Sequence, residues 1–214
     1  MNRILNASIL LAISSSVFVR GQLVESFGLK TGLSIANQSF VFTPIDYSLP
    51  TDVLLSPGVV FFLESFKGEH LSFQLDLGYI AKGNKTTAQS VTVNHLDNDN
   101  IVVNEGPLAI SKYHYLFFSP LARYRQEREK LVVYALLGPR LDYQLKYSTD
   151  SEYPLDGQSD IILGLTGGFG FEYKLEKVAV FTEIQYQADL SPVTNTEPLL
   201  VNNNCLFVNV GVRY

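Results

Sequence analysis

The stretch LSFQLDLGY, residues 71–79, decides the fold class of this chain. Its odd-numbered positions are apolar, whereas its even-numbered positions hold Ser72, Gln74, Asp76 and Gly78. Successive side chains of a β-strand point to opposite faces, so a period of two predicts a strand with one apolar and one polar face. The same alternation recurs along the chain, and no amphipathic helix of useful length competes with it.

The sequence predicts eight such strands, over residues 26–37, 56–66, 70–83, 112–126, 130–147, 159–175, 177–190 and 204–214. Three of the connections are tight polar turns, as at Lys67-Gly68-Glu69. The other four are long and polar, and they cover residues 38–55, 84–111, 148–158 and 191–203. Strict alternation of short and long connections is expected of an outer-membrane barrel, with short turns in the periplasm and long loops outside.

A sheet of such strands in a membrane is expected to close into a barrel. An edge exposed to lipid would leave backbone N–H and C=O groups unpaired, so the strands must pair all the way round. Tilted strands of about 11 residues cover the roughly 25 Å apolar band of an outer membrane. The sequence therefore predicts an all-β fold, an eight-stranded antiparallel up-and-down transmembrane β-barrel with short periplasmic turns and long extracellular loops.

The first 21 residues have the features of a secretory signal peptide. Arg3 is the positive charge, residues 4–19 are mostly apolar, and Val19-Arg20-Gly21 resembles a cleavage site. A buried or transmembrane N-terminal helix is the alternative, but the apolar run is short and contains Ser14-Ser15-Ser16. We expect a signal peptide over residues 1–21 and an outer-membrane β-barrel domain over residues 22–214.

Composition excludes several classes of protein. The chain is 46% hydrophobic and 17% charged, and no run outside the N-terminus is long enough for a membrane-spanning helix. Its formal net charge of −5 gives no support for nucleic-acid binding. Cys205, the single cysteine of the sequence, has no partner for an internal disulfide.

Alternation alone does not say which face is inside. A soluble carrier barrel with an apolar cavity has the same period, but its exterior rarely holds many glycines. Here charged residues of both signs alternate with glycine on the polar face, which suits a narrow lumen of paired charges. This predicted lumen charge network comprises Lys30, Glu64, Asp76, Arg123, Arg140, Asp142, Glu172, Glu183 and Arg213.

Two features of the apolar face also favour a membrane. Aromatic side chains lie toward its strand ends, where interface girdles occur, at Phe27, Tyr79, Tyr143, Tyr173 and Tyr186. The chain also ends inside its last strand on an aromatic residue. Val210, Val212 and Tyr214 alternate there, in a pattern that resembles the C-terminal signal read by the barrel-assembly machinery.

Several stretches together resemble the small PorT-like outer-membrane barrels of Bacteroidota. They are FGLKTGLS at 27–34, LGY at 77–79 with Lys82-Gly83, Tyr115 with PLARY at 120–124, and VGVRY at 210–214. The resemblance implies an outer-membrane location and an eight-stranded antiparallel barrel. It implies no single activity, although some relatives take part in type IX secretion and gliding.

Catalytic chemistry has one candidate. His114 and Ser111, with a loop acid such as Asp97 or Asp99, could form a Ser–His–acid arrangement at the outer rim, as in an envelope enzyme acting on lipid A. The simpler interpretation is a structural rim histidine. Residues 97–100 lack the Gly and Glu of a calcium loop and are better explained as a hairpin tip. We expect no catalytic residue, no metal and no cofactor.

We expect any function to lie in the long loops, because an eight-stranded barrel is narrow enough for side chains to fill its interior. We expect a non-enzymatic protein that acts in envelope structure, adhesion or partner binding. The alternatives are an enzyme acting on lipid A and a component of a secretion apparatus. The expected partners are outer-membrane lipid, lipopolysaccharide, the barrel-assembly machinery and an envelope protein, without nucleic acid.

Overall fold

The computed structural model describes residues 24–214 apart from 43–46, 49–50, 67, 95–99, 151–156 and 197–198. In that part of the chain no helix is long and apolar enough to cross a membrane. The strands are β1 (Ser26–Phe42), β2 (Tyr47–Ser48), β3 (Asp52–Ser65), β4 (Leu71–Asn94), β5 (Asn100–Arg128), β6 (Leu131–Thr149), β7 (Ile161–Lys174), β8 (Ala179–Asp189), β9 (Thr194–Thr196) and β10 (Leu199–Arg213).

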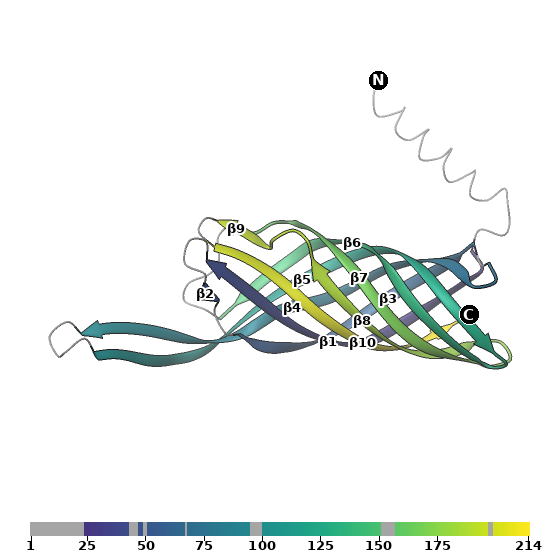
Figure 1. Ribbon diagram of the computed structural model, residues 1–214, viewed down its shortest axis with the longest axis horizontal. Coiled ribbons are helices and arrows are strands. Elements are labelled where there is room, and N and C mark those ends of the chain that lie inside the picture. Colours follow the sequence, from purple (N-terminus) through teal and green to yellow (C-terminus); the bar gives the residue numbers. More distant parts are fainter. Residues whose placement is uncertain are drawn as a thin grey trace, which may run out of the picture.

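The eight long strands form a closed barrel (Figure 1). Each pairs antiparallel with the next long strand, and β10 pairs back with β1 from Gly28↔Arg213 to Phe42↔Leu199. The short strands β2 and β9 add to β1 and β10 only at the end with the long connections. The predicted eight-stranded antiparallel barrel is confirmed, and its closure leaves no lipid-exposed edge along the barrel wall.

The predicted loop over residues 84–111 is wrong. β4 and β5 continue through it as a two-stranded ribbon, paired from Lys85↔Ile110 to Asn94↔Asn100 with a bulge between Thr87 and Gln89. Figure 1 shows this ribbon projecting well beyond the barrel at the end with the long connections. The hairpin tip predicted at 97–100 falls largely on residues 95–99, which lie outside the described residues.

Two other predicted loops are also shorter than expected. β1 continues past residue 37 to Phe42, and β10 already begins at Leu199, because these two strands remain paired above the barrel wall. β3 begins at Asp52, inside the predicted connection 38–55. Each of these strands is longer than its alternation of apolar and polar residues predicted, because its backbone stays paired with a neighbouring strand.

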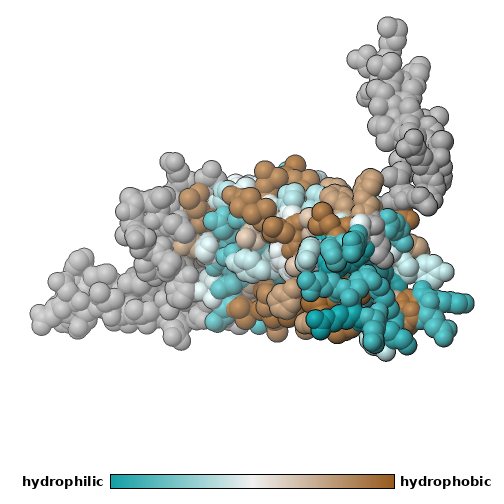
Figure 2. Space-filling model, turned by 45° about the vertical axis from the view of Figure 1, so that its right-hand side comes forward, coloured by the Kyte–Doolittle hydropathy of each residue, from teal (hydrophilic) through white to brown (hydrophobic). Residues whose placement is uncertain are grey.

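The barrel wall is apolar outside and polar inside. Along β3 the burial alternates residue by residue, and outward residues such as Val59 and Phe61 are 42% and 43% exposed. Figure 2 shows brown apolar side chains over the barrel wall and a teal hydrophilic cluster at its right-hand end. So much exposed apolar surface is unfavourable in water and is expected of a wall that faces lipid. The protein is a transmembrane barrel of the outer membrane, as the sequence predicted.

Candidate functional site

Among the described residues, the lumen holds twelve buried charged side chains, six basic and six acidic. They are Lys30, Lys82, Arg123, Arg125, Arg140 and Arg213, with Glu64, Asp76, Asp142, Glu172, Glu183 and Asp189. Their formal charges cancel. An isolated buried charge is very unfavourable, so each must be paired or hydrogen-bonded. The structure arranges the twelve in three clusters along the barrel.

The lower cluster lies toward the short turns and centres on Glu64. Arg123 and Arg125 place guanidinium nitrogens 3.1 and 3.0 Å from its carboxylate, and Arg213 pairs with the same group. Glu172 completes the cluster, at 2.7 Å from Arg123 and 3.0 Å from Arg213. Three arginines therefore share two carboxylates, with each carboxylate bridging strands that are distant in the sequence.

The middle cluster centres on Lys30. Its Nζ lies 2.7 Å from Asp76 Oδ2 and 2.7 Å from Glu183 Oε1. Tyr134 donates a hydrogen bond of 3.0 Å to the other oxygen of Glu183, and Gln185 Nε2 donates one of 2.8 Å to Oε1. One ammonium group thus joins β1, β4 and β8 across the lumen, and polar side chains occupy the remaining acceptor positions.

The upper cluster lies toward the long connections. Lys82 Nζ lies 2.6 Å from Asp142 Oδ2 and 3.7 Å from Asp189 Oδ1. Arg140 reaches Asp142 at 2.8 Å and also pairs with Asp189. Lys82 and Asp189 belong to this cluster, although neither was in the predicted network. Every residue of that predicted network is buried in one of the three clusters.

Sequence reasoning missed the apolar part of the lumen. A cluster of buried apolar side chains also lies inside the barrel, with members on β1, β3, β4, β5, β7 and β10. It includes Val60, Ile80, Phe117 and Phe207, each 0–1% exposed. The alternation contained a signal for them, because all four occupy inward positions in otherwise polar faces.

The glycines of the polar face make room for rings. Phe62 lies directly across from Gly28 in the β1–β3 ladder, and a Cβ on Gly28 would come 2.5 Å from that ring. Phe181 lies across from Gly211 in the same way, at 2.4 Å. Any larger residue would displace the ring, so inward glycines let aromatic side chains lie against the wall and fill the lumen.

Ser111 and His114 are not brought together. Ser111 Oγ hydrogen-bonds Thr149 Oγ1 at 3.0 Å on the inner side of β5. His114 faces outward, and its Nδ1 hydrogen-bonds the hydroxyl of Tyr79 at 2.5 Å. Asp97 and Asp99 lie outside the described residues. Within the described residues, no three His, Cys, Asp or Glu side chains cluster as metal ligands would.

The C-terminal residue helps to close the barrel. Its backbone N–H donates to Phe27 O at 2.8 Å, and its carbonyl accepts from Phe27 N–H at 3.1 Å. The Tyr214 and Phe27 rings pack with centroids 5.6 Å apart. Val210 and Val212 are exposed on the same outer wall. The chain end is therefore part of the β1–β10 seam.

No protein-family model matches the sequence, and no curated protein does either. Among solved structures, the chain is similar to the outer membrane protease OmpT from Escherichia coli, with a TM-score of 0.47, 8% identity and coverage of 92% of this chain and 99% of that one. It is similar to the outer membrane protein OprG from Pseudomonas aeruginosa, with a TM-score of 0.45 and 13% identity, over 91% of this chain and 98% of that one. It also resembles Ail, the attachment invasion locus protein of Yersinia pestis, in complex with the heparin analogue sucrose octasulfate. The TM-score is 0.41 and the identity 12%, over 88% of this chain and 98% of that one. Likenesses this distant transfer no activity to this chain.

Proposed function

We propose that this chain is a non-enzymatic outer-membrane barrel that acts through its extracellular end, in envelope structure, adhesion or partner binding. The observation that carries the proposal is the filling of the lumen. Charges from all eight long strands pair across it, and buried rings such as Phe117 and Phe207 fill more of the interior. A lumen packed in this way leaves the outer surface and the extracellular elements to carry function.

The β4–β5 ribbon is the strongest candidate for the acting element. It extends from Lys85↔Ile110 to Asn94↔Asn100, and β3 pairs with β4 only as far as Lys85. A two-stranded ribbon standing alone in water is marginally stable and gains from a contact partner. Backbone edges in such a ribbon can pair with a strand of another protein. Lipopolysaccharide at the cell surface and an envelope protein are the partners we propose.

Export and assembly belong to the same proposal. Residues 1–21 act as a cleaved signal peptide, and the C-terminal pattern Val210, Val212 and Tyr214 is read by the barrel-assembly machinery. Support for the second point comes from the position of Tyr214, whose backbone pairs with Phe27 at the seam between the first and the last strand. The lumen charge network then acts as a structural plug that holds the finished barrel closed.

The finer family assignment is a PorT-like barrel of Bacteroidota. Its support is the order of the glycine and aromatic stretches, from FGLKTGLS at 27–34 to VGVRY at 210–214. A role in a secretion apparatus is the alternative that this assignment raises. A barrel that serves secretion would be recovered in a complex with other envelope proteins after mild detergent extraction.

One observation favours an enzyme as the alternative. His114 and Tyr79 form a hydrogen-bonded pair on the outward face of β4 and β5, near the lysines Lys112 and Lys146. A histidine facing the outer leaflet would be placed to act on lipid A. Mass spectrometry of lipid A from cells that overexpress the protein tests this, because an altered acylation or phosphorylation pattern lost in His114→Ala would support the enzyme.

The test of the main proposal removes the ribbon. Lys85 and Ile110 are cross-strand partners, so an Asn-Gly turn can join them in place of residues 86–109. We expect this shortened barrel to fold, as judged by heat-dependent mobility on gels, but to lose the wild type's binding to vesicles that contain lipopolysaccharide. Equal binding by both proteins, with both barrels folded, would contradict a role of the ribbon.

A further inference from the structure

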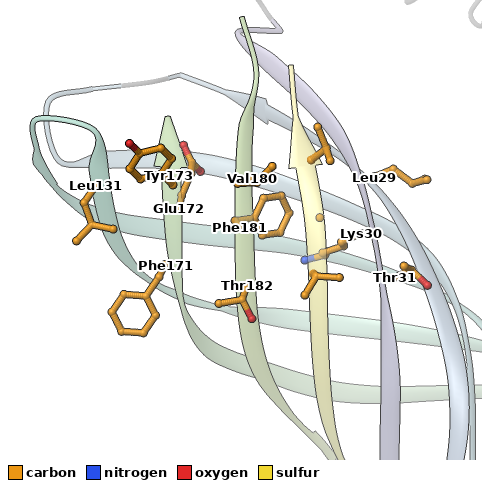
Figure 3. Close-up of a pocket in the computed structure, with 13 residues that line it drawn as sticks. Leu29, Lys30, Thr31, Leu131, Phe171, Glu172, Tyr173, Val180, Phe181 and Thr182 are labelled. Atoms are coloured by element: carbon orange, nitrogen blue, oxygen red, sulfur yellow. The ribbon is translucent and has the colours of Figure 1, made fainter. Parts of the chain in front are cut away.

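A groove of about 760 Å³ crosses the outer wall of the barrel near the short turns. Figure 3 shows Leu131 and Tyr173 on one side of it and Leu29 and Thr31 on the other, with β8 and β10 between them. The groove opens to the outside of the barrel. Lys30 and Glu172 also line it, but their side chains are buried and paired in the lumen clusters.

Two adjacent cross-strand rows of outward side chains form the groove. The first row runs Leu131–Tyr173–Val180–Val212–Leu29, and the second runs Phe171–Thr182–Val210–Thr31. Each row has a bulky aromatic residue on its β7 side, and only Val or Thr on β8 and β10. Short β-branched side chains between taller neighbours leave a depression across the strands.

The groove offers no free hydrogen-bonding group among its outward side chains except the Tyr173 hydroxyl at one end. Both threonine hydroxyls are used within the wall. Thr31 donates a hydrogen bond of 3.0 Å to Gly58 O, and Thr182 donates one of 3.3 Å to Asn209 O. Partners that associate inside a membrane rely on packing and on hydrogen bonds from such small polar residues. With its hydroxyls already bonded, the groove contributes van der Waals contact alone.

The groove lies between two aromatic parts of the outer wall. On its periplasmic side lies the aromatic pair Phe27 and Tyr214, and on its other side lie Phe169 and Ile184. Phe169, like the groove residues, is exposed on the apolar wall. The groove is therefore continuous with the lipid-facing wall and lies in its periplasmic half, where the surrounding medium is hydrocarbon.

We propose that this groove is a specific binding site for one acyl chain of a phospholipid in the periplasmic leaflet. The chain lies across β8 and β10, between Phe171 and Tyr173 on one side and Leu29 on the other. A second copy of the barrel is the rival occupant. It would need polar groups or a flat complementary surface for orientation, and the groove supplies neither.

The test measures lipid retention by native mass spectrometry. Wild-type protein refolded in mild detergent is titrated with palmitoyl-oleoyl phosphatidylethanolamine. Val180→Phe fills the groove, and Val59→Phe is its matched control because both valines are 42% exposed on the outer wall and only Val180 lines the groove. Thr182→Phe is the second filling variant, for use if Val180→Phe fails to show the heat-dependent mobility of a folded barrel.

We expect one retained lipid on the wild type and on Val59→Phe. Val180→Phe should bind it about tenfold more weakly, which corresponds to ~1.4 kcal/mol of lost van der Waals contact. Phosphatidylglycerol with the same chains should bind as well, since the groove contacts hydrocarbon only. Equal retention by all variants would overturn the proposal. A mass of two protein chains that Val180→Phe reduces to one would also overturn it, in favour of self-association.

Discussion

Gly170 on β7 lies directly across from Tyr134 on β6, and the tyrosine ring fills the space where a Cβ at position 170 would stand. That Cβ would come 2.4 Å from the ring, so no side chain fits without displacing it. The flat position of the ring lets the Tyr134 hydroxyl reach Glu183 at 3.0 Å and lets Arg123 stack 4.0 Å from its centroid. Because Gly170 has no side chain, the Tyr134 ring can contact both the lower and the middle charge clusters.

Gly170→Ala should consequently destabilise the barrel by about 1–3 kcal/mol, the usual effect of overpacking a filled interior. Gly167→Ala on the same strand is the control, because a Cβ there points outward and makes only ordinary contacts, 3.6 Å from Leu137 Cδ1 and 3.9 Å from Leu136 O. Urea unfolding in detergent micelles, followed by tyrosine fluorescence, measures both. The ring-packing explanation fails if the two variants unfold at the same urea concentration.

Breaking the paired lumen charges should also lower stability. Glu183→Leu leaves Lys30 with Asp76 alone, and Arg140→Leu leaves the carboxylates of the upper cluster short of one cation. Removing one partner of a buried ion pair costs about 3–5 kcal/mol. We expect a lower melting temperature in detergent for both variants. Glu176→Leu, at an exposed turn position, is the control and should melt like the wild type.

Loss of the terminal aromatic should affect assembly more than stability. Tyr214→Ala keeps both backbone hydrogen bonds to Phe27 and removes only the ring contact. We expect much less of this variant in the outer membrane of expressing cells, but near-normal refolding of the purified chain into detergent. Tyr173→Ala removes another exposed aromatic side chain from the same end of the wall and should assemble normally. Equal outer-membrane levels of the two variants would argue against an assembly signal.

A filled lumen predicts that the barrel does not conduct. We expect no open-channel steps when the purified wild type is inserted into planar lipid bilayers, because buried charges and rings occupy the interior. The double variant Phe117→Ala and Phe207→Ala removes two of those rings and should allow brief conductance events. Stable ohmic conductance of the wild type would contradict a structural plug.

Much of the fold could be predicted from local sequence. Stretches such as 71–79 alternate strictly, because each strand has one face in lipid and one in the lumen. The sequence predicted a hairpin tip at 97–100 but not the full length of the ribbon, whose residues lie beyond the wall. No lipid imposes an apolar face there, so the alternation weakens although the backbone pairing continues. The rim hypothesis for Ser111 failed for a related reason, since residues three apart on a strand, such as Ser111 and His114, face opposite sides.

By itself, the sequence determined that one face of every strand would be apolar and the other charged, since that property depends only on the order of residues along the chain. Only the tertiary structure decided which charges meet. Lys30 is 46 residues from Asp76 and 153 residues from Glu183, yet its Nζ lies 2.7 Å from each. Closure of the barrel sets those neighbours, because strand register and the β1–β10 seam fix which inward positions face one another across the lumen.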